Sequence, residues 1–171
     1  MKKMIIMLSL ILVSSGIQSQ GYTTNLDFFA GTWQYINETT NEEFTLILKK
    51  SVYINEEEIA CLVGVYTYKV NGAVVTDTMD EFVLNKYALK MPVIIREMAI
   101  SDSNKFRLMI NDRKFNKFTV GSVIEIVSTS PAKIHWTLTE DEGEEVYSPG
   151  ETIKPNGFSV PVNMVLTKVS E

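Results

Sequence analysis

Few residues of this chain have the chemistry needed for catalysis. His135 is the only histidine and Cys61 the only cysteine, so a Ser-His-Asp or Cys-His site would depend on His135. Cys61 lies in an apolar run, residues 59–63, which indicates a small buried side chain and not a reactive thiol. His135 alternates with Ile134 and Trp136, so we expect it to face away from the core. We therefore predict that the protein is not an enzyme, and we assign no catalytic residue.

Carboxylates cluster in two places, but neither has the spacing of a known ligand set. A zinc site needs three or four nitrogen, sulfur or carboxylate ligands, which one histidine and one buried cysteine do not supply. The segment 140–145 holds five carboxylates in six residues without the alternating pattern of a calcium loop. Residues 56–58 are three glutamates, and we interpret both segments as solvated turns. We expect no metal and no cofactor, while glycoside hydrolysis by two carboxylates that the fold brings together stays open.

Trp33, Arg96 and Trp136 are the candidate ligand-binding residues. Arg96 lies among mostly apolar neighbours, residues 93–98. An arginine in such surroundings could hold the anionic head group of a ligand inside a barrel. The alternatives for Arg96 are a pair with a carboxylate or a side chain that extends to the rim.

The charge of the chain argues against nucleic acid as a partner. The formal net charge is −5, and it would be −7 without Lys2 and Lys3. An acidic domain repels a phosphate backbone, and the densest basic segment, residues 113–117, has only three charges. We interpret that segment as a solvated loop and exclude nucleic-acid binding.

The first residues have the layout of a secretory signal peptide. Lys2 and Lys3 precede an apolar run, residues 4–13, and small and polar residues follow it. The run is too short for a stable transmembrane helix. We expect residues 1–19 to be removed and residues 20–171 to form one domain, exported to the periplasm or the extracellular space with no transmembrane segment in the mature form.

Most of the remaining chain is predicted to form β-strands. Ile134, Trp136 and Leu138 share one face of a run and the more polar residues between them share the other, which is typical of an antiparallel strand with one buried side. Asn71-Gly72 between two such runs predicts a tight hairpin. We expect strands near residues 31–38, 42–54, 59–70, 73–76, 79–87, 93–101, 105–111, 120–128, 132–139 and 158–169, and one helical turn at residues 27–30.

These elements predict an all-β fold with little helix. Short polar links between neighbouring strands favour an antiparallel up-and-down topology of about 8–10 strands, and a sheet of that size closes into a barrel or splits into a sandwich to protect its edges. We expect a barrel. The side chains expected to face its interior are Trp33, Leu46, Leu48, Phe106, Leu108, Ile134, Trp136 and Leu166.

Two sets of residues carry a family resemblance. Gly31-x-Trp33 at the start of the first strand resembles the lipocalins and fatty-acid-binding proteins, together called calycins. Residues 31–35, 44–50, 62–68 and 161–168 are similar to an uncharacterised family of small secreted Bacteroidota proteins, DUF6705. The resemblance implies a secreted lipocalin-like barrel and no known activity. Lipocalins place an arginine of the last strand against the first-strand tryptophan, and Lys168 is the nearest candidate here. Asp77-Thr78-Met79 resembles the O-glycosylation pattern of secreted Bacteroidota proteins.

Two functions remain in competition at this point, with catalysis behind both. The first is a binding protein that holds a small apolar or amphipathic ligand in its barrel. The second is a cell-envelope interaction or structural protein whose barrel is filled by its own side chains, since an eight-stranded barrel can be either filled or hollow. The expected partner is accordingly a small hydrophobic ligand or a component of the cell envelope.

Overall fold

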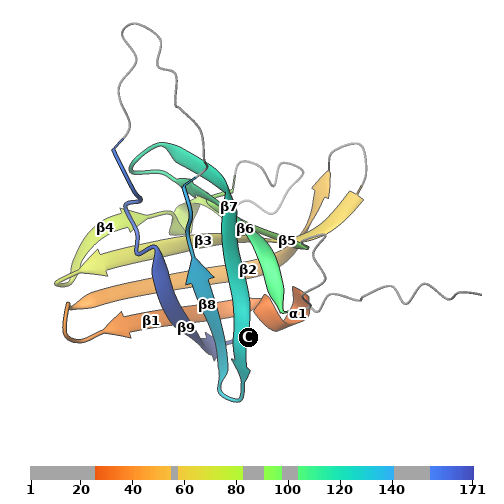
Figure 1. Ribbon diagram of the computed structural model, residues 1–171, viewed down its shortest axis with the longest axis horizontal. Coiled ribbons are helices and arrows are strands. Elements are labelled where there is room, and N and C mark those ends of the chain that lie inside the picture. Colours follow the sequence, from red (N-terminus) through yellow and green to blue (C-terminus); the bar gives the residue numbers. More distant parts are fainter. Residues whose placement is uncertain (1–25, 55–57, 83–90, 98–103, 141–154) are drawn as a thin grey trace, which may run out of the picture.

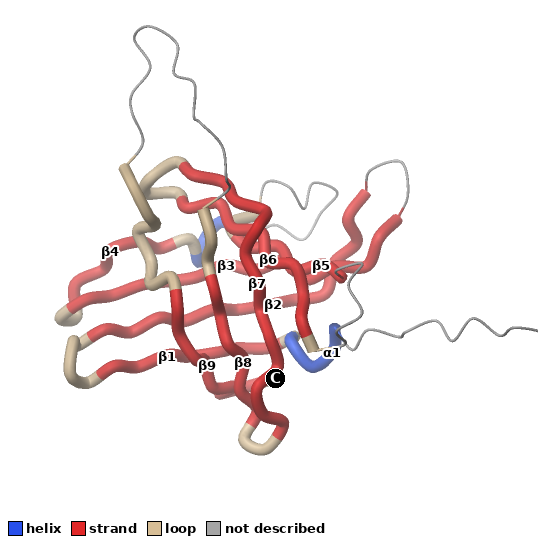
Figure 2. The backbone as a smooth tube through the Cα atoms, in the orientation of Figure 1, coloured by secondary structure: helices blue, strands red, loops and turns tan. Residues whose placement is uncertain are grey.

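The computed structural model describes residues 26–54, 58–82, 91–97, 104–140 and 155–171. They form a short helix, nine strands and one 3-10 turn (Figures 1 and 2). The elements are α1 (Leu26–Phe29), β1 (Gly31–Asn37), β2 (Glu42–Ile54), β3 (Glu58–Val70), β4 (Ala73–Asp77), η1 (Met79–Glu81), β5 (Val93–Glu97), β6 (Lys105–Asp112), β7 (Lys117–Thr129), β8 (Ala132–Thr137) and β9 (Asn163–Ser170).

Eight of the strands close into an antiparallel barrel. Each strand of the barrel pairs with its neighbour in the sequence, except that β3 pairs with β5, and β9 returns to pair with β1. The remaining strand, β4, forms a hairpin with β3 outside the closed ring. The predicted up-and-down barrel is confirmed, because successive strands of the ring are antiparallel neighbours and the last strand closes on the first.

Asparagines shape three of the hairpin turns. Asn71 and Gly72 both have positive φ, 52° and 74°, as the predicted Asn-Gly turn between β3 and β4 requires. Asn41 and Asn116 also have positive φ, 51° and 52°, in the turns that follow β1 and β6. Asparagine tolerates this left-handed conformation better than most residues, so these turns are encoded locally.

One end of the barrel is closed by α1 and the start of β1. Gly31 has φ 119°, and a Cβ at this position would collide with the carbonyl oxygen of Ser170, so the first strand needs glycine here. The Trp33 indole donates a hydrogen bond from Nε1 to the carbonyl of Phe29, 2.7 Å away. Lys168 Nζ lies 5.6 Å from the centre of the Trp33 rings and donates to the carbonyl of Phe28. Lys168 therefore occupies the place against the first-strand tryptophan that the resemblance implies.

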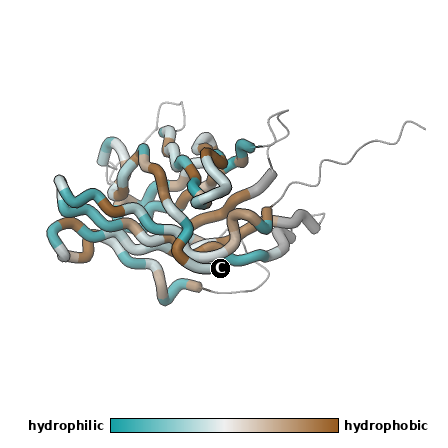
Figure 3. Tube along the Cα trace, turned by 90° about the horizontal axis from the view of Figure 1, so that it is seen from below, coloured by the Kyte–Doolittle hydropathy of each residue, from teal (hydrophilic) through white to brown (hydrophobic). Residues whose placement is uncertain are grey.

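The barrel interior is packed with large apolar side chains. All eight residues predicted to face inward belong to this cluster, and each is at most 1% exposed. Hydrophobic and hydrophilic residues alternate along the strands (Figure 3), which is why one face of each strand is available for the core. The cluster comprises Phe29, Trp33, Phe44, Leu46, Leu48, Leu62, Tyr66, Tyr68, Val93, Ile95, Phe106, Leu108, Ile110, Ile124, Ile134, Trp136, Leu138, Val160, Met164 and Leu166.

A second apolar cluster lies on the outer face of β3, β5 and β6. Its buried members alternate along the strands with residues of the interior cluster, so they project from the opposite side of the sheet. Met79 and Phe82 of the η1 region pack against it. The sheet is buried on both faces here, which explains why residues 61–66 and 91–95 read as continuous apolar runs. The buried members are Cys61, Val63, Val65, Met91, Ile94 and Met109.

Two predicted strands are wrong in part. The strand expected at 79–87 is a 3-10 turn at Met79–Glu81, and residues 83–87 lie outside the described residues. The residue before this turn, Thr78, is fully buried. Its Oγ1 accepts a hydrogen bond from the Tyr66 amide at 2.8 Å and donates one to the Tyr66 carbonyl at 3.0 Å. The Thr78 amide also donates to the Tyr66 carbonyl, at 2.9 Å, and the 3-10 turn begins at the next residue. The strand expected at 158–169 begins only at Asn163.

The other predicted elements agree with the structure to within a few residues. α1 covers Leu26–Phe29 where a turn was expected at 27–30, and β7 is longer than expected, Lys117–Thr129. β5 ends at Glu97, and the rest of the strand expected at 93–101 lies outside the described residues. The expected signal peptide, residues 1–19, also lies outside them.

Candidate functional site

The two tryptophans of the candidate set lie at different levels of the barrel. Trp33 is opposite Lys168 in the β1–β9 pairing, whereas Trp136 is opposite Met164 in the β8–β9 pairing. These partners are four residues apart along β9, about 13 Å at the rise of a strand. Both indoles are inaccessible to solvent, but the structure does not bring them together in one site.

The backbone of Arg96 lies in β5 and takes part in the pairing of β5 with β6. It pairs with Arg107 of β6, whose side chain is exposed, and alternates with Val93 and Ile95, which belong to the interior cluster. The side chain of Arg96 itself lies outside the described part of the chain. Ligand binding by Arg96 stays a prediction.

Aromatic side chains surround Trp136 in the half of the barrel away from α1. Its ring centre lies 5.4 Å from that of Phe44, and Phe44 in turn stacks on Tyr66 at 5.6 Å with 21° between the ring planes. The ring of Tyr68 lies 6.5 Å from Phe44. We call these four residues the aromatic group.

The indole nitrogen of Trp136 makes no hydrogen bond. It is the one buried side-chain nitrogen or oxygen in the described residues without a partner. An unpaired buried donor costs about 1–3 kcal/mol, so this atom requires an explanation. It is the most unusual polar feature of the interior.

Both tyrosines of the aromatic group keep their hydroxyl protons. Tyr68 donates from its hydroxyl to Glu42 Oε1 at 2.6 Å, and this hydrogen bond, with one from Thr40, lowers the pKa of Glu42. Burial raises the pKa of Tyr68, and the Glu42 carboxylate raises it further. Burial also raises the pKa of Tyr66, with a contribution from the charge of Asp112. The two hydroxyls are therefore donors at neutral pH.

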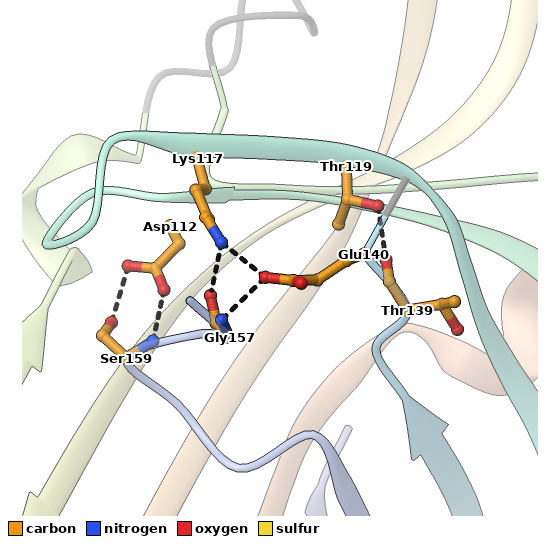
Figure 4. Close-up of polar contacts among 7 residues, drawn as sticks. All are labelled: Asp112, Lys117, Thr119, Thr139, Glu140, Gly157 and Ser159. Carbon is orange, nitrogen blue, oxygen red and sulfur yellow. Dashed lines mark hydrogen bonds and ion pairs between the residues drawn. The ribbon is translucent and has the colours of Figure 1, made fainter. Parts of the chain in front are cut away.

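A buried carboxylate anchors the chain that precedes β9. Asp112, at the end of β6, is fully buried and accepts from Ser159 Oγ and the Ser159 amide, at 2.6 and 2.5 Å (Figure 4). It also accepts from the amides of Lys114 and Phe115 in the β6–β7 turn. We call residues 155–162 the cover segment. It leads into β9 and places Phe158 and Val160 against the interior cluster.

An ion pair holds the same segment from β7. Lys117 Nζ contacts Glu140 Oε1 at 2.5 Å and donates to the Gly157 carbonyl at 3.0 Å, and Glu140 accepts from the Gly157 amide at 2.7 Å (Figure 4). The hydrogen bond from Lys117, followed by that from Gly157, lowers the pKa of Glu140. Lys117 and Glu140 were predicted to belong to solvated segments. The Glu140 side chain is 52% exposed, in agreement, whereas that of Lys117 is only 14% exposed. Both fasten the cover segment, and residues 141–145 lie outside the described residues.

The chain beyond β8 is fixed to β7 by two further hydrogen bonds. Thr119 Oγ1 donates to the Thr139 carbonyl at 2.8 Å (Figure 4), and the Thr139 amide donates to Ser122 Oγ at 3.0 Å. The amide of Leu138 donates to the carbonyl of Val162 at 2.8 Å. Pairs this distant in sequence were not detectable from periodicity, which reports only which face a residue takes.

Three hollows lined by described residues lie on the outside of the sheet. One of about 510 Å³ is lined by Gln34, Tyr35, Ile36, Val165, Thr167 and Val169. Another, of about 420 Å³, adjoins the β1–β2 turn, and a third, of about 220 Å³, lies between β2, β3 and β4. None of these three hollows is lined by a buried member of the interior cluster. Tyr35, which lines the first of them, is partly buried and packs against that cluster.

The residues considered for catalysis and modification have other roles. His135 lies on the outer face, and its Nε2 is 2.9 Å from Asn163 Oδ1, as its alternation predicted. Cys61 is buried in the outer cluster on β3, also as predicted. Thr78 is fully buried and its hydroxyl bonds the backbone, so the folded chain does not present it for glycosylation. The described residues contain no group of three or more His, Cys, Asp or Glu side chains placed to hold a metal.

These observations define a class of protein: a closed, eight-stranded antiparallel β-barrel with an interior filled by aromatic and aliphatic side chains. The chain belongs to DUF6705, a family of unknown function, whose family model matches residues 1–169. No curated protein and no solved structure matches it. Within the described residues, no helix has the length and apolar character needed to cross a membrane.

Proposed function

We propose that the protein is exported and acts through the outer surface of a filled barrel, as an interaction or structural protein of the cell envelope. The observation that carries this proposal is the absence of accessible surface on the interior side chains. Trp33, Phe44, Tyr66, Phe106 and Trp136 are all 0% exposed.

This burial supports a filled barrel over a hollow one. Pockets for small ligands have volumes of about 300–1,000 Å³, and a hollow of that size leaves its lining side chains with surface that a water molecule can touch. The five large side chains named above have no such surface, and Tyr68 of the same cluster is only 7% exposed. The barrel therefore offers no ready space for a fatty acid or a retinoid, and its interior serves stability.

The outer surface has apolar side chains that the barrel does not use. Ile36 is 58% exposed, Val165 45% and Val169 55%, and all three line the hollow of about 510 Å³ over β1 and β9. We call these three residues the β1–β9 patch. Exposed apolar side chains that lie together are typical of contact surfaces, and this patch is the place where we propose contact with an envelope component.

Export and the absence of catalysis are parts of the same proposal. Export is supported by Lys2, Lys3 and the apolar run that follows them, and the intact mass of the native protein tests it: loss of about nineteen residues is expected, and full-length protein in the cytoplasm would contradict it. The separation of Cys61 on β3 from His135 on β8 supports a protein without a nucleophile–base pair.

The contact surface is tested by fractionating cells that produce variants of the full chain. We expect Ile36→Glu with Val165→Glu to move the protein from the envelope fraction to the soluble fraction. Val74→Glu is the matched control, because Val74 is 57% exposed but lies on β4. Wild-type protein found only in the soluble fraction, or equal release by both variants, would refute the proposed surface.

Binding of a ligand in the barrel is the second candidate function, and one observation favours it. The indole N–H of Trp136 is a donor that nothing in the described residues satisfies. A panel of fatty acids, retinoids and small aromatic dyes, followed by tryptophan fluorescence, separates the two functions: the filled barrel predicts no saturable change with the long-chain ligands.

A further inference from the structure

We infer that the aromatic group and the cover segment form a self-occupied binding site for a planar aromatic ring that bears a hydrogen-bond acceptor. The ring displaces the apolar side chains of the cover segment and accepts a hydrogen bond from Trp136 Nε1. This inference goes beyond the proposed surface function and does not depend on it, because the two use opposite faces of the sheet.

The unpaired donor supplies the first argument. Trp136 Nε1 is inside the barrel and has no hydrogen-bond partner among the described residues, while the other interior tryptophan, Trp33, has a carbonyl 2.7 Å away. A buried N–H without a partner raises the free energy of the unbound protein. A bound ligand whose acceptor reaches the N–H removes this cost, which favours the bound state. A ligand with an acceptor has this advantage over a purely apolar one.

The walls of the site determine the shape of the ligand. Three rings lie in a row in space, with the Phe44 ring centre 5.4 Å from that of Trp136 and 5.6 Å from that of Tyr66. Aromatic rings prefer offset stacked or edge-to-face neighbours at about 4.5–7 Å, so a flat ring fits among them better than a flexible chain. The site is also close to the end of the barrel, since Trp136 is the last residue but one of β8.

The cover segment is attached in a way that allows release. Between Gly157 and Ser159 it has no strand pairing, and its described anchors there are side chains of other elements: Asp112 holds Ser159, and Lys117 and Glu140 hold Gly157 (Figure 4). Only at its last residue, Val162, is a backbone bond described, from the Leu138 amide. Water can replace such polar contacts when the segment moves outward. The barrel ladder stays intact, because β9 begins only at Asn163.

The apolar side chains of the segment are what a ligand replaces. Val160 is buried in the interior cluster, and Phe158 packs against that cluster while Lys117 Nζ lies 5.8 Å from its ring. A phenyl ring and an isopropyl group together are similar in size to a bicyclic aromatic compound. The ligand class is thus a bicyclic heteroaromatic with one ring acceptor.

Quinoline and naphthalene test the inference as a matched pair, because they share a shape and differ by one ring nitrogen. Binding to the exported form of the chain, residues 20–171, is measured by NMR of the two indole N–H signals, with Trp136→Phe assigning them. We expect quinoline to bind about threefold to tenfold more tightly than naphthalene, as one hydrogen bond provides, and to shift only the Trp136 signal. The preference should disappear in Trp136→Phe.

A second set of variants tests the cover segment. Ser159→Ala removes one bond to Asp112 and should tighten binding of both compounds by about the same factor, whereas Ser128→Ala on β7 should leave it unchanged. If Ser159→Ala does not fold, Phe158→Ala opens the same space without removing an anchor. Equal binding of quinoline and naphthalene, or no binding to either cover-segment variant, would overturn the inference. Neither result bears on release from the envelope fraction.

Discussion

Replacing each interior tryptophan by phenylalanine isolates the hydrogen-bond state of its indole. Trp33 and Trp136 are both 0% exposed, and both exchanges remove the same atoms. Loss of that apolar volume costs about 1–2 kcal/mol in each case. Trp33→Phe also leaves the Phe29 carbonyl without its donor, which adds about 1–3 kcal/mol. Trp136→Phe instead removes a donor that was already unpaired, which returns a similar amount.

The free energy of unfolding should therefore fall by about 3 kcal/mol in Trp33→Phe and stay within about 1 kcal/mol of wild type in Trp136→Phe. Urea unfolding followed by far-UV circular dichroism measures both, with an unchanged dependence on urea concentration as the control for two-state behaviour. An equal loss of stability in the two variants would show that Trp136 Nε1 has a partner, and it would remove the first argument for the site proposed beneath the cover segment.

Three further predictions concern the closed end, the cover segment and the acid range. Gly31→Ala should lower the free energy of unfolding by more than about 2 kcal/mol, because φ is 119° and a Cβ would meet the Ser170 carbonyl. Gly72→Ala, with open space around the new Cβ, should cost about 1 kcal/mol. Similar melting temperatures of the two variants would contradict this. Asp112→Ala should cost about 3–5 kcal/mol, since several buried donors lose their acceptor; a cost below 1 kcal/mol in urea unfolding would refute the anchoring role. The pKa values of Glu42 and Glu140 are lowered in the folded chain, so their contributions to stability are present above pH 4.5 and are lost as the pH falls through the lowered values; the double variant with glutamine should lose less stability than wild type between pH 5 and pH 2, and identical acid curves would contradict it.

The faces of the strands were predictable from the sequence because side chains alternate with period two. Trp33, Leu46 and Ile134 were expected inside and are inside, and Asn71-Gly72 was expected to turn the chain and does so. These features depend on neighbouring residues and on the intrinsic preferences of asparagine and glycine. The same reasoning placed His135 outside the barrel.

The predictions that failed concern residues whose partners are distant in the chain. At residues 79–81 a 3-10 turn takes the place of the expected strand, next to the contact of Thr78 with Tyr66 of β3. The late start of β9 follows the anchoring of Ser159 by Asp112, 47 residues away. Lys117 and Glu140 looked like members of solvated charged segments because the sequence does not indicate that they lie beside each other. Such pairs exist only once strands are aligned.

The sequence by itself determined most of the strands, the Asn71-Gly72 turn and eight of the side chains that fill the interior, since each follows from local period and local backbone preference. Only the tertiary structure decided how the barrel closes, through the pairing of β1 with β9 from opposite ends of the described chain. It also aligned Arg96 with Arg107 across β5 and β6. Within the part of the chain that the structure describes, it gave one of two buried tryptophans a hydrogen-bond partner and left the other without one. The physical reason is that alternation fixes which side of a strand a residue occupies, whereas register and the meeting of distant segments fix what it touches.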